Sequence, residues 1–279
     1  MTPLLLQTVI ADFGALPAAN ETVTQLVDYL AQDEIEVSAV ARMIARDPVL
    51  AAKSLRLANS SVYGLQRPVS TILDAVTVLG QQSISTMVTA MAVTGRFRSQ
   101  QATGYDLRLF WLHNVATALS ARALARYTRL NPESAFAAGL IHDIGTLVLA
   151  TRFPEHFAAV LDYQREQDCR TIDAERKVLG FDHAAIGGAL AQEWKFAPEV
   201  ARAVAGHHEP EQHPASTLTS LIHLANVMAH VLNFAEDEND LVPRISEFAC
   251  ERLSLDWSDF KCAMAEVDGQ RQDAELFFS

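Results

Sequence analysis

Apolar residues recur at the spacing of an α-helix from one end of the chain to the other. Near the start, Val23, Leu26, Val27 and Leu30 fall three or four positions apart, which places them on one helical face. No stretch between two turn signals alternates apolar and polar residues over the length of a strand. The pattern therefore predicts an all-α fold, a bundle of many helices.

Capping residues and prolines mark where several of these helices begin. In Asp47-Pro48 and in Asn131-Pro132, a side chain that can cap a helix precedes a proline at the first helical position. These pairs predict helices that start at residues 48 and 132. Further helices are expected over residues 21–31, 83–97, 105–127, 182–195, 198–206 and 218–232.

Two more helix starts rest on single polar side chains. Ser38 is expected to cap a helix that runs through Ile44. Thr71 and Asp74 form a plausible capping pair for a helix over residues 72–79, which Gly80 would end.

The helices fall into three parts: an N-terminal subdomain (residues 1–100), a histidine-bearing part (101–235) and a C-terminal helical extension (236–279). A polar break with a glycine, near residues 99–104, separates the first two parts, and an acidic loop over residues 236–240 precedes the third. We expect the N-terminal helices to pack on the histidine-bearing helices around one core.

The composition narrows the partners and the compartment. The 279 residues carry 22 Lys and Arg against 34 Asp and Glu, a net charge of −12, and no basic patch offsets it. A surface so negative repels phosphate backbones, so nucleic acid is not an expected partner. Cys169, Cys250 and Cys262 are scattered, which suits a reducing compartment. No secretory signal or membrane-spanning run is evident, so we expect a cytoplasmic protein without a membrane partner.

His142 and Asp143 stand together inside the apolar stretch of residues 138–149. Burying an imidazole and a carboxylate is costly unless they are satisfied. They can satisfy each other and nearby backbone, or they can hold a metal ion. Adjacent helical positions point roughly 100° apart, so the pair alone fits a structural role slightly better than a metal site.

Other histidines change this balance. His113 lies in the apolar helix before the pair, His183 opens a later helix, and His207-His208 follow a helix end. Together with Asp143 they favour a metal site over a purely hydrogen-bonded cluster. Nitrogen and oxygen ligands suit iron, manganese or zinc, and no organic cofactor is expected. The remaining histidines are interpreted as surface or core polar residues: His156, His213, His223 and His230.

The order of these histidines resembles the HD superfamily of metal-dependent phosphohydrolases, especially its HD-GYP phosphodiesterase branch. Five motifs, in order along the chain, are similar to those of the HDOD domain: Leu16-Pro17, Ile44-Ala45-Arg46-Asp47-Pro48, Leu55-Arg56-Leu57-Ala58-Asn59-Ser60, Ala75-Val76-Thr77-Val78-Leu79-Gly80 and Ala138-Gly139-Leu140-Ile141-His142-Asp143-Ile144-Gly145. The resemblance covers roughly residues 16–229. It implies an HD-type helical bundle that acts as an output or scaffolding module of bacterial signalling proteins.

The sequence departs from active relatives at four places. Asn226 stands where they place a late aspartate ligand, and Thr146 stands where HD-GYP proteins have a lysine. Leu109 replaces a glutamate of multi-metal members, and no Gly-Tyr-Pro signature follows His208. With Asn226 as a weaker ligand beside the histidines and Asp143, the resemblance implies that metal binding survives and hydrolysis does not.

We therefore expect an HDOD regulatory or scaffold protein of signal transduction with a degenerate, metal-binding HD site, whose partners are signalling proteins. The alternative is an active metal-dependent phosphohydrolase. A third interpretation is a sensor that binds a nucleotide in the same pocket without turning it over.

Overall fold

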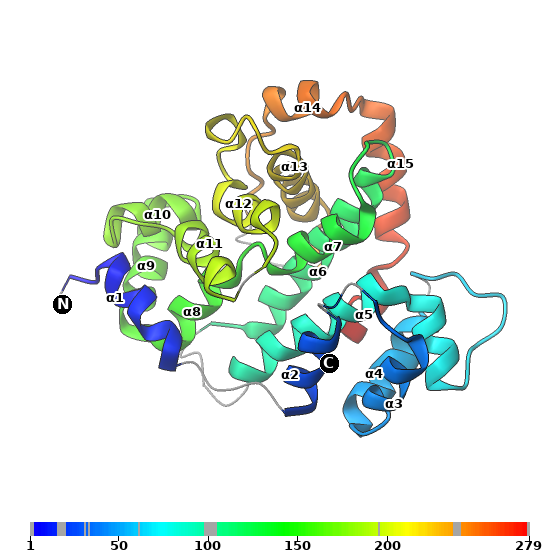
Figure 1. Cartoon of the computed structure of the whole chain (residues 1–279). Coiled ribbons are helices and arrows are strands. Elements are labelled where there is room, and N and C mark those ends of the chain that lie inside the picture. Colours follow the sequence, from blue (N-terminus) through cyan, green and yellow to red (C-terminus); the bar gives the residue numbers. More distant parts are fainter. Residues whose placement is uncertain are drawn as a thin grey trace. The chain divides into compact units, whose positions relative to one another are not determined.

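The computed structural model describes residues 3–15, 21–30, 32, 34–60, 62–97, 105–194, 196–236 and 241–277. Every regular element within these residues is a helix, which confirms the all-α prediction (Figure 1). The chain divides into two compact units, one of Met1–Leu16 with Gln100–Asp268 and one of Pro17–Ser99 with Gly269–Ser279. The predicted break near residues 99–104 and most of the acidic loop lie outside the described residues. The single shared core stays a prediction.

The smaller unit is built around one long helix. It contains α2 (Glu21–Leu30), α3 (Val37–Ile44), α4 (Pro48–Ala58), α5 (Ile72–Phe97) and the 3-10 helix η3 (Arg271–Phe277). Helix α5 contacts α2, α3 and α4, and η3 contacts α4. Leu26, Ile44 and Leu50 are fully buried in its core.

The predicted caps of this unit are confirmed with one exception. The Asp47 carboxylate accepts hydrogen bonds from the backbone N–H groups of residues 49 and 50 at 2.8 and 3.1 Å. Thr71 and Asp74 bond to each other at the start of α5, and Gly80 interrupts that helix with a φ of 73°. The prediction for Ser38 is wrong, because α3 already begins at Val37 and the Ser38 hydroxyl bonds to the Glu36 carboxylate instead.

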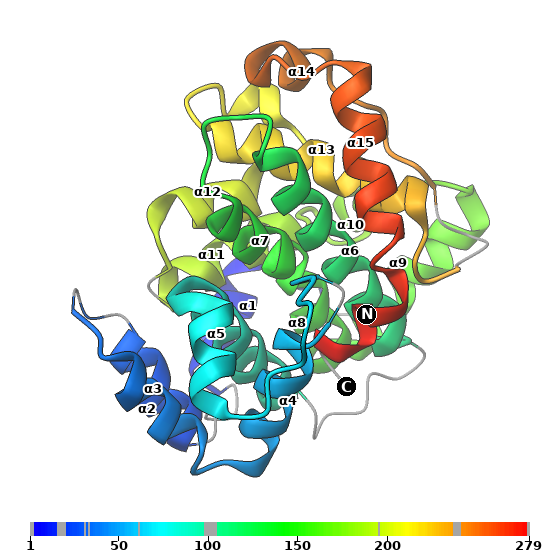
Figure 2. The ribbon, with the colours of Figure 1, turned by 90° about the vertical axis from the view of Figure 1, so that its right-hand side faces the viewer.

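The larger unit contains the histidine-bearing helices. Its elements are α1 (Leu6–Ala11), η1 (Asp12–Ala15), α6 (Leu107–Ala125), α7 (Pro132–Ile141), α8 (Ile144–Arg152), α9 (Pro154–Gln167), α10 (Thr171–Val178), α11 (His183–Glu193), α12 (Pro198–Gly206), η2 (Pro210–Gln212), α13 (Thr217–Leu232), α14 (Glu247–Leu253) and α15 (Trp257–Asp268). Helix α6 is central, since it packs against α7, α13 and α15 (Figure 2). Its buried residues face all sides, as its apolar sequence predicts.

The sequence interpretation of His142 and Asp143 as neighbours within one helix is wrong. Helix α7 ends at Ile141 and α8 begins at Ile144, so both residues lie in the turn between the two helices. Because the chain changes direction there, two adjacent side chains can approach the same point. Asn131 caps α7 as predicted. Its side-chain oxygen accepts hydrogen bonds from the backbone N–H groups of residues 133 and 134 at 2.9 and 3.0 Å.

Among the described residues, the stretch Pro132–Arg152 is long and apolar enough to cross a membrane. It comprises α7, the turn and α8, and 78% of it is buried inside the fold. Burial of this kind is typical of the core helices of soluble proteins.

Candidate metal site

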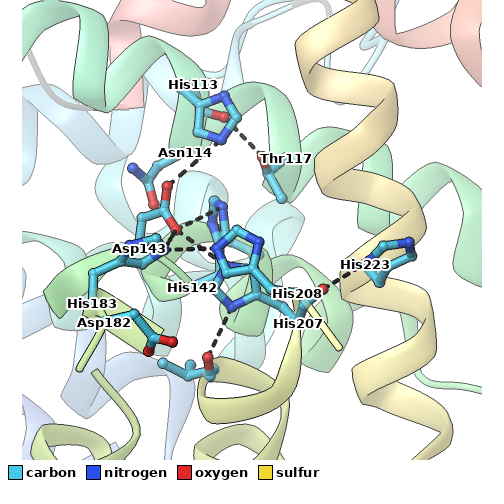
Figure 3. Close-up of polar contacts among 12 residues, drawn as sticks. His113, Asn114, Thr117, His142, Asp143, Asp182, His183, His207, His208 and His223 are labelled. Atoms are coloured by element: carbon cyan, nitrogen blue, oxygen red, sulfur yellow. Dashed lines mark hydrogen bonds and ion pairs between the residues drawn. The ribbon is translucent and has the colours of Figure 1, made fainter. Parts of the chain in front are cut away.

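Five histidines and Asp143 converge in the larger unit, and they come from four places in its fold. His113 comes from α6, His142 and Asp143 from the turn after α7, His183 from the start of α11, and His207 and His208 from the end of α12. Figure 3 shows the imidazole rings of His142, His183, His207 and His208 beside the Asp143 carboxylate, with His113 on its other side. The structure therefore brings these six predicted residues together.

The contacts of Asp143 define the centre of the cluster. Its Oδ1 atom lies 3.3, 3.2 and 3.3 Å from the Nε2 atoms of His142, His183 and His207. Its Oδ2 atom lies 3.7 Å from Nε2 of His113. Ligand atoms that lie about 2.0–2.2 Å from a tetrahedral metal are separated by roughly 3.3–3.6 Å. The spacing around Oδ1 is close to that separation.

The cluster contains two overlapping groups of candidate ligands. In one group Asp143 joins His183, His207 and His208, and in the other it joins His113 and His142. The ligand atoms of each group lie within 4.8 Å of one another. Asp143 belongs to both, so a single carboxylate links the two halves of the cluster.

Two of the rings are oriented by backbone carbonyl groups. Nδ1 of His142 lies 2.7 Å from the carbonyl oxygen of Gly139, and Nδ1 of His207 lies 2.8 Å from that of Val204. A carbonyl oxygen only accepts, so each Nδ1 carries a proton, and whenever such a ring is neutral its Nε2 presents a lone pair toward Asp143. Neither Nε2 atom nor Asp143 Oδ1 has a hydrogen-bond partner among the described residues, although all three are buried.

The pKa values of His142 and Asp143 indicate that hydrogen-bond acceptors of the two side chains face each other. Burial lowers the pKa of His142 well below its usual value, and the neighbouring His207 and His113 lower it further, outweighing Asp143. Burial would raise the pKa of Asp143, but the imidazoles around it, among them His183 with its raised pKa, outweigh burial and hold the pKa of Asp143 well below its usual value. An ionised carboxylate thus meets imidazole lone pairs in a buried place, where a cation between them would be stabilising.

His183 has a different environment. Its Nδ1 lies 2.6 Å from Oε2 of Glu175, and its Nε2 lies 2.8 Å from Nε2 of His208. Burial opposes protonation of His183, but the charges of Glu175 and Asp143 outweigh it and raise its pKa well above the usual value. Burial and the neighbouring His207 and His183 lower the pKa of His208. In the metal-free state, a proton on His183 Nε2 can therefore be donated to His208.

A cavity of about 820 Å³ opens beside the cluster. His113, Asp143, His183 and His208 line it on one side. Three departures from active relatives also line it: Leu109, Thr146 and Asn226. The Asn226 side chain is buried, and its Oδ1 has no hydrogen-bond partner among the described residues.

Sequence reasoning missed two residues of the site. Glu175, which orients His183, has no local sequence signal that separates it from an ordinary helical glutamate. His230 also lines the cavity, and its ring centroid lies 4.5 Å from that of His113. A signal for it exists, since residues 226 and 230 are one helical turn apart on α13 and share a face.

The sequence profile of the HDOD domain matches residues 16–210 of the chain. The chain belongs to the HDOD domain family. An uncharacterised protein of Treponema pallidum is 24% identical to this HDOD chain over 241 residues, which are 84% of the chain and 45% of that relative. The chain thus spans less than half the length of the curated relative.

Solved structures resemble the HDOD chain along nearly its whole length. An HDOD domain protein from Geobacter sulfurreducens has a TM-score of 0.78 and 24% identity, with 97% of each chain covered. A Shewanella amazonensis protein named as a candidate phosphohydrolase has a TM-score of 0.77 and 27% identity, with 97% of this chain and 98% of that one covered. A Marinobacter aquaeolei protein, named as a candidate signal transduction protein, has a TM-score of 0.75 and 23% identity, with 100% of this chain and 62% of that one covered.

Proposed function

We propose that this HDOD protein is a regulatory or scaffolding module of signal transduction that holds a divalent metal around Asp143 and does not hydrolyse phosphodiesters. One observation carries the proposal: the buried Nε2 atoms of His142 and His207 each lie 3.3 Å from Asp143 Oδ1, and none of these three atoms has a hydrogen-bond partner among the described residues. The metal would be held by the whole predicted set: His113, His142, Asp143, His183, His207, His208 and Asn226. Iron, manganese and zinc suit such nitrogen and oxygen ligands.

The departures that line the cavity support binding without turnover. Phosphodiester hydrolysis concentrates negative charge, which hydrolases meet with metals on anionic ligands and with a nearby cation. Here Asn226 and Thr146, both neutral, occupy the positions of an anionic ligand and a cation. The arginines that line the cavity, Arg165 and Arg170, are each ion-paired with an aspartate of their own segment.

The alternative function is an active metal-dependent phosphohydrolase, in which bound metal activates water and polarises a phosphoryl oxygen. The histidine set and the adjoining cavity favour it, as does the name of the Shewanella amazonensis relative. A sensor of nucleotides is an intermediate case. The cavity volume falls within the roughly 300–1,000 Å³ of small-molecule sites, and such a sensor would bind without turnover.

An assay with a cyclic dinucleotide in the presence of Mn²⁺ or Fe²⁺ separates these functions. We expect no turnover by the wild type, and activity in Asn226→Asp alone would support a degenerate site kept for binding. Turnover by the wild type that His142→Ala abolishes would establish the phosphohydrolase and contradict the proposal. Calorimetric titration of the wild type with the same compound tests the sensor, which requires binding without product.

A further inference from the structure

Helix α10 carries two neighbouring charged residues that contact different parts of the metal cluster's surroundings. Glu175 is fully buried, and its Oε2 atom accepts from the backbone N–H of His183 at 2.9 Å and contacts Nδ1 of that residue at 2.6 Å. Arg176 is half exposed and reaches over the segments that flank His183 and His208.

His183 needs such help because of its position in a helix. His142 and His207 follow the last turns of α7 and α12, so a carbonyl three residues earlier orients each ring. His183 is the first residue of α11 and has no preceding helical turn to offer a carbonyl. The acceptor for its Nδ1 comes from another helix, α10. Of these three rings, the orientation of His183 alone depends on a tertiary contact.

Arg176 holds together the two chain segments that carry His183 and His208. Its Nε atom lies 2.7 Å from Asp182, the residue that caps α11 and precedes His183. Its two terminal nitrogens lie 2.9 and 2.8 Å from the carboxylate oxygens of Glu209, which follows His208. A planar guanidinium that makes such a two-point contact fixes both distance and orientation.

We propose that Glu175 and Arg176 are positioning residues for one half of the metal cluster, the His183–His208 edge. Glu175 sets the tautomer and the direction of the His183 ring, and Arg176 sets the separation between the backbones on either side of that edge. The inference rests on the proposed metal-binding function. Loss of partners of this kind typically weakens metal affinity by about 10–100-fold.

The test is a titration of the full-length protein with Co²⁺, following its visible absorption and its dissociation constant, in Arg176→Ala, Arg176→Lys, Glu175→Gln and Glu175→Ala. Arg126→Ala is the matched control, because Arg126 at the end of α6 also pairs with a glutamate of another helix, its Nη1 atom lying 2.8 Å from each carboxylate oxygen of Glu266. Thermal unfolding of each metal-free variant records any general loss of stability.

We expect Arg176→Ala and Glu175→Ala to weaken Co²⁺ binding by about 10–100-fold and to change its spectrum. Arg176→Lys and Glu175→Gln should recover part of the affinity, and Arg126→Ala should bind as the wild type does. If Glu175→Ala does not fold, Glu175→Gln and Arg176→Ala decide. Unchanged affinity and spectrum in Arg176→Ala, or an equal loss in Arg126→Ala, would overturn the positioning role. If the wild type binds no Co²⁺, the proposed metal-binding function itself is overturned, and not only the positioning role.

Discussion

Gly145 lies where α8 passes against the start of α11, and the packing there leaves no room for a side chain. A Cβ atom at residue 145 would lie 2.0 Å from the carbonyl oxygen of His183 and 2.8 Å from the backbone nitrogen of Gly187. Both are backbone atoms, which cannot rotate away as a side chain can. Gly145→Ala must therefore push α8 and α11 apart.

The size of the displacement follows from the contact distances. Ordinary contact begins near 3.4 Å, so the Cβ and the carbonyl oxygen at 2.0 Å must separate by about 1.4 Å. Metal–ligand distances tolerate only about 0.2 Å. Asp143 and His183, now 3.2 Å apart, stand on opposite sides of this contact. We expect Gly145→Ala to abolish metal binding and to lower the free energy of unfolding by about 1–3 kcal/mol.

The assay is thermal unfolding of Gly145→Ala with and without Mn²⁺. Leu124→Ala is the control, since Leu124 is fully buried at the far end of α6 from His113 and its truncation costs about 2–5 kcal/mol. We expect Leu124→Ala to lower the unfolding temperature yet keep its stabilisation by Mn²⁺. Gly145→Ala should both lower the unfolding temperature and lose the stabilisation by Mn²⁺. A Gly145→Ala protein that is as stable as the wild type and gains as much from Mn²⁺ would refute the reasoning.

Two further predictions concern protonation and the backbone. The charges of Glu175 and Asp143 outweigh burial and raise the pKa of His183 in the metal-free protein, so a bound metal must displace a proton. In the metal-free protein that proton stabilises the fold. The stabilisation is fully present below the pKa of about 6.5 that histidine has in the unfolded chain, and it is lost as pH rises through the higher pKa of His183 in the folded protein. Calorimetric metal affinity and the rise in unfolding temperature on metal addition should therefore both increase from about pH 6 to pH 8; a pH-independent rise would contradict this. Gly80 adopts a φ of 73° and a ψ of 166°, a region essentially confined to glycine, with no atom near its missing Cβ. Gly80→Ala should therefore cost roughly 1–3 kcal/mol in urea unfolding from backbone strain alone, and an unchanged midpoint would contradict the strain.

Helix boundaries were predictable where the signal is local. Asp47 and Asn131 cap the helices that their sequence position indicates, because a capping side chain reaches only two or three residues along the chain. The convergence of the histidines was predictable in outline from the order of the motifs. The turn at His142 and Asp143 was not, since the apolar pattern resumes directly after these two residues and neither of them is a glycine or a proline.

Contacts between distant parts of the chain leave no such signal. Arg176 meets Glu209 across 33 residues, and Arg152 meets Asp12 across 140 residues, at 2.6 and 2.9 Å. A charged residue on an exposed helix face has the same local pattern whether it binds a distant partner or water. The support of His183 by Glu175 is hidden for the same reason, since only the packing of α10 shows which glutamate is buried.

The most direct test of the metal site is elemental analysis of the full-length protein purified without added metal, beside the double variant His142→Ala with Asp143→Ala. The account predicts iron, manganese or zinc at roughly one ion per chain or more in the wild type, and none in the folded double variant, which should also lose the stabilisation that bound metal provides. A wild type that carries none of these metals and is not stabilised by adding them would contradict the account, as would a double variant with the same metal content.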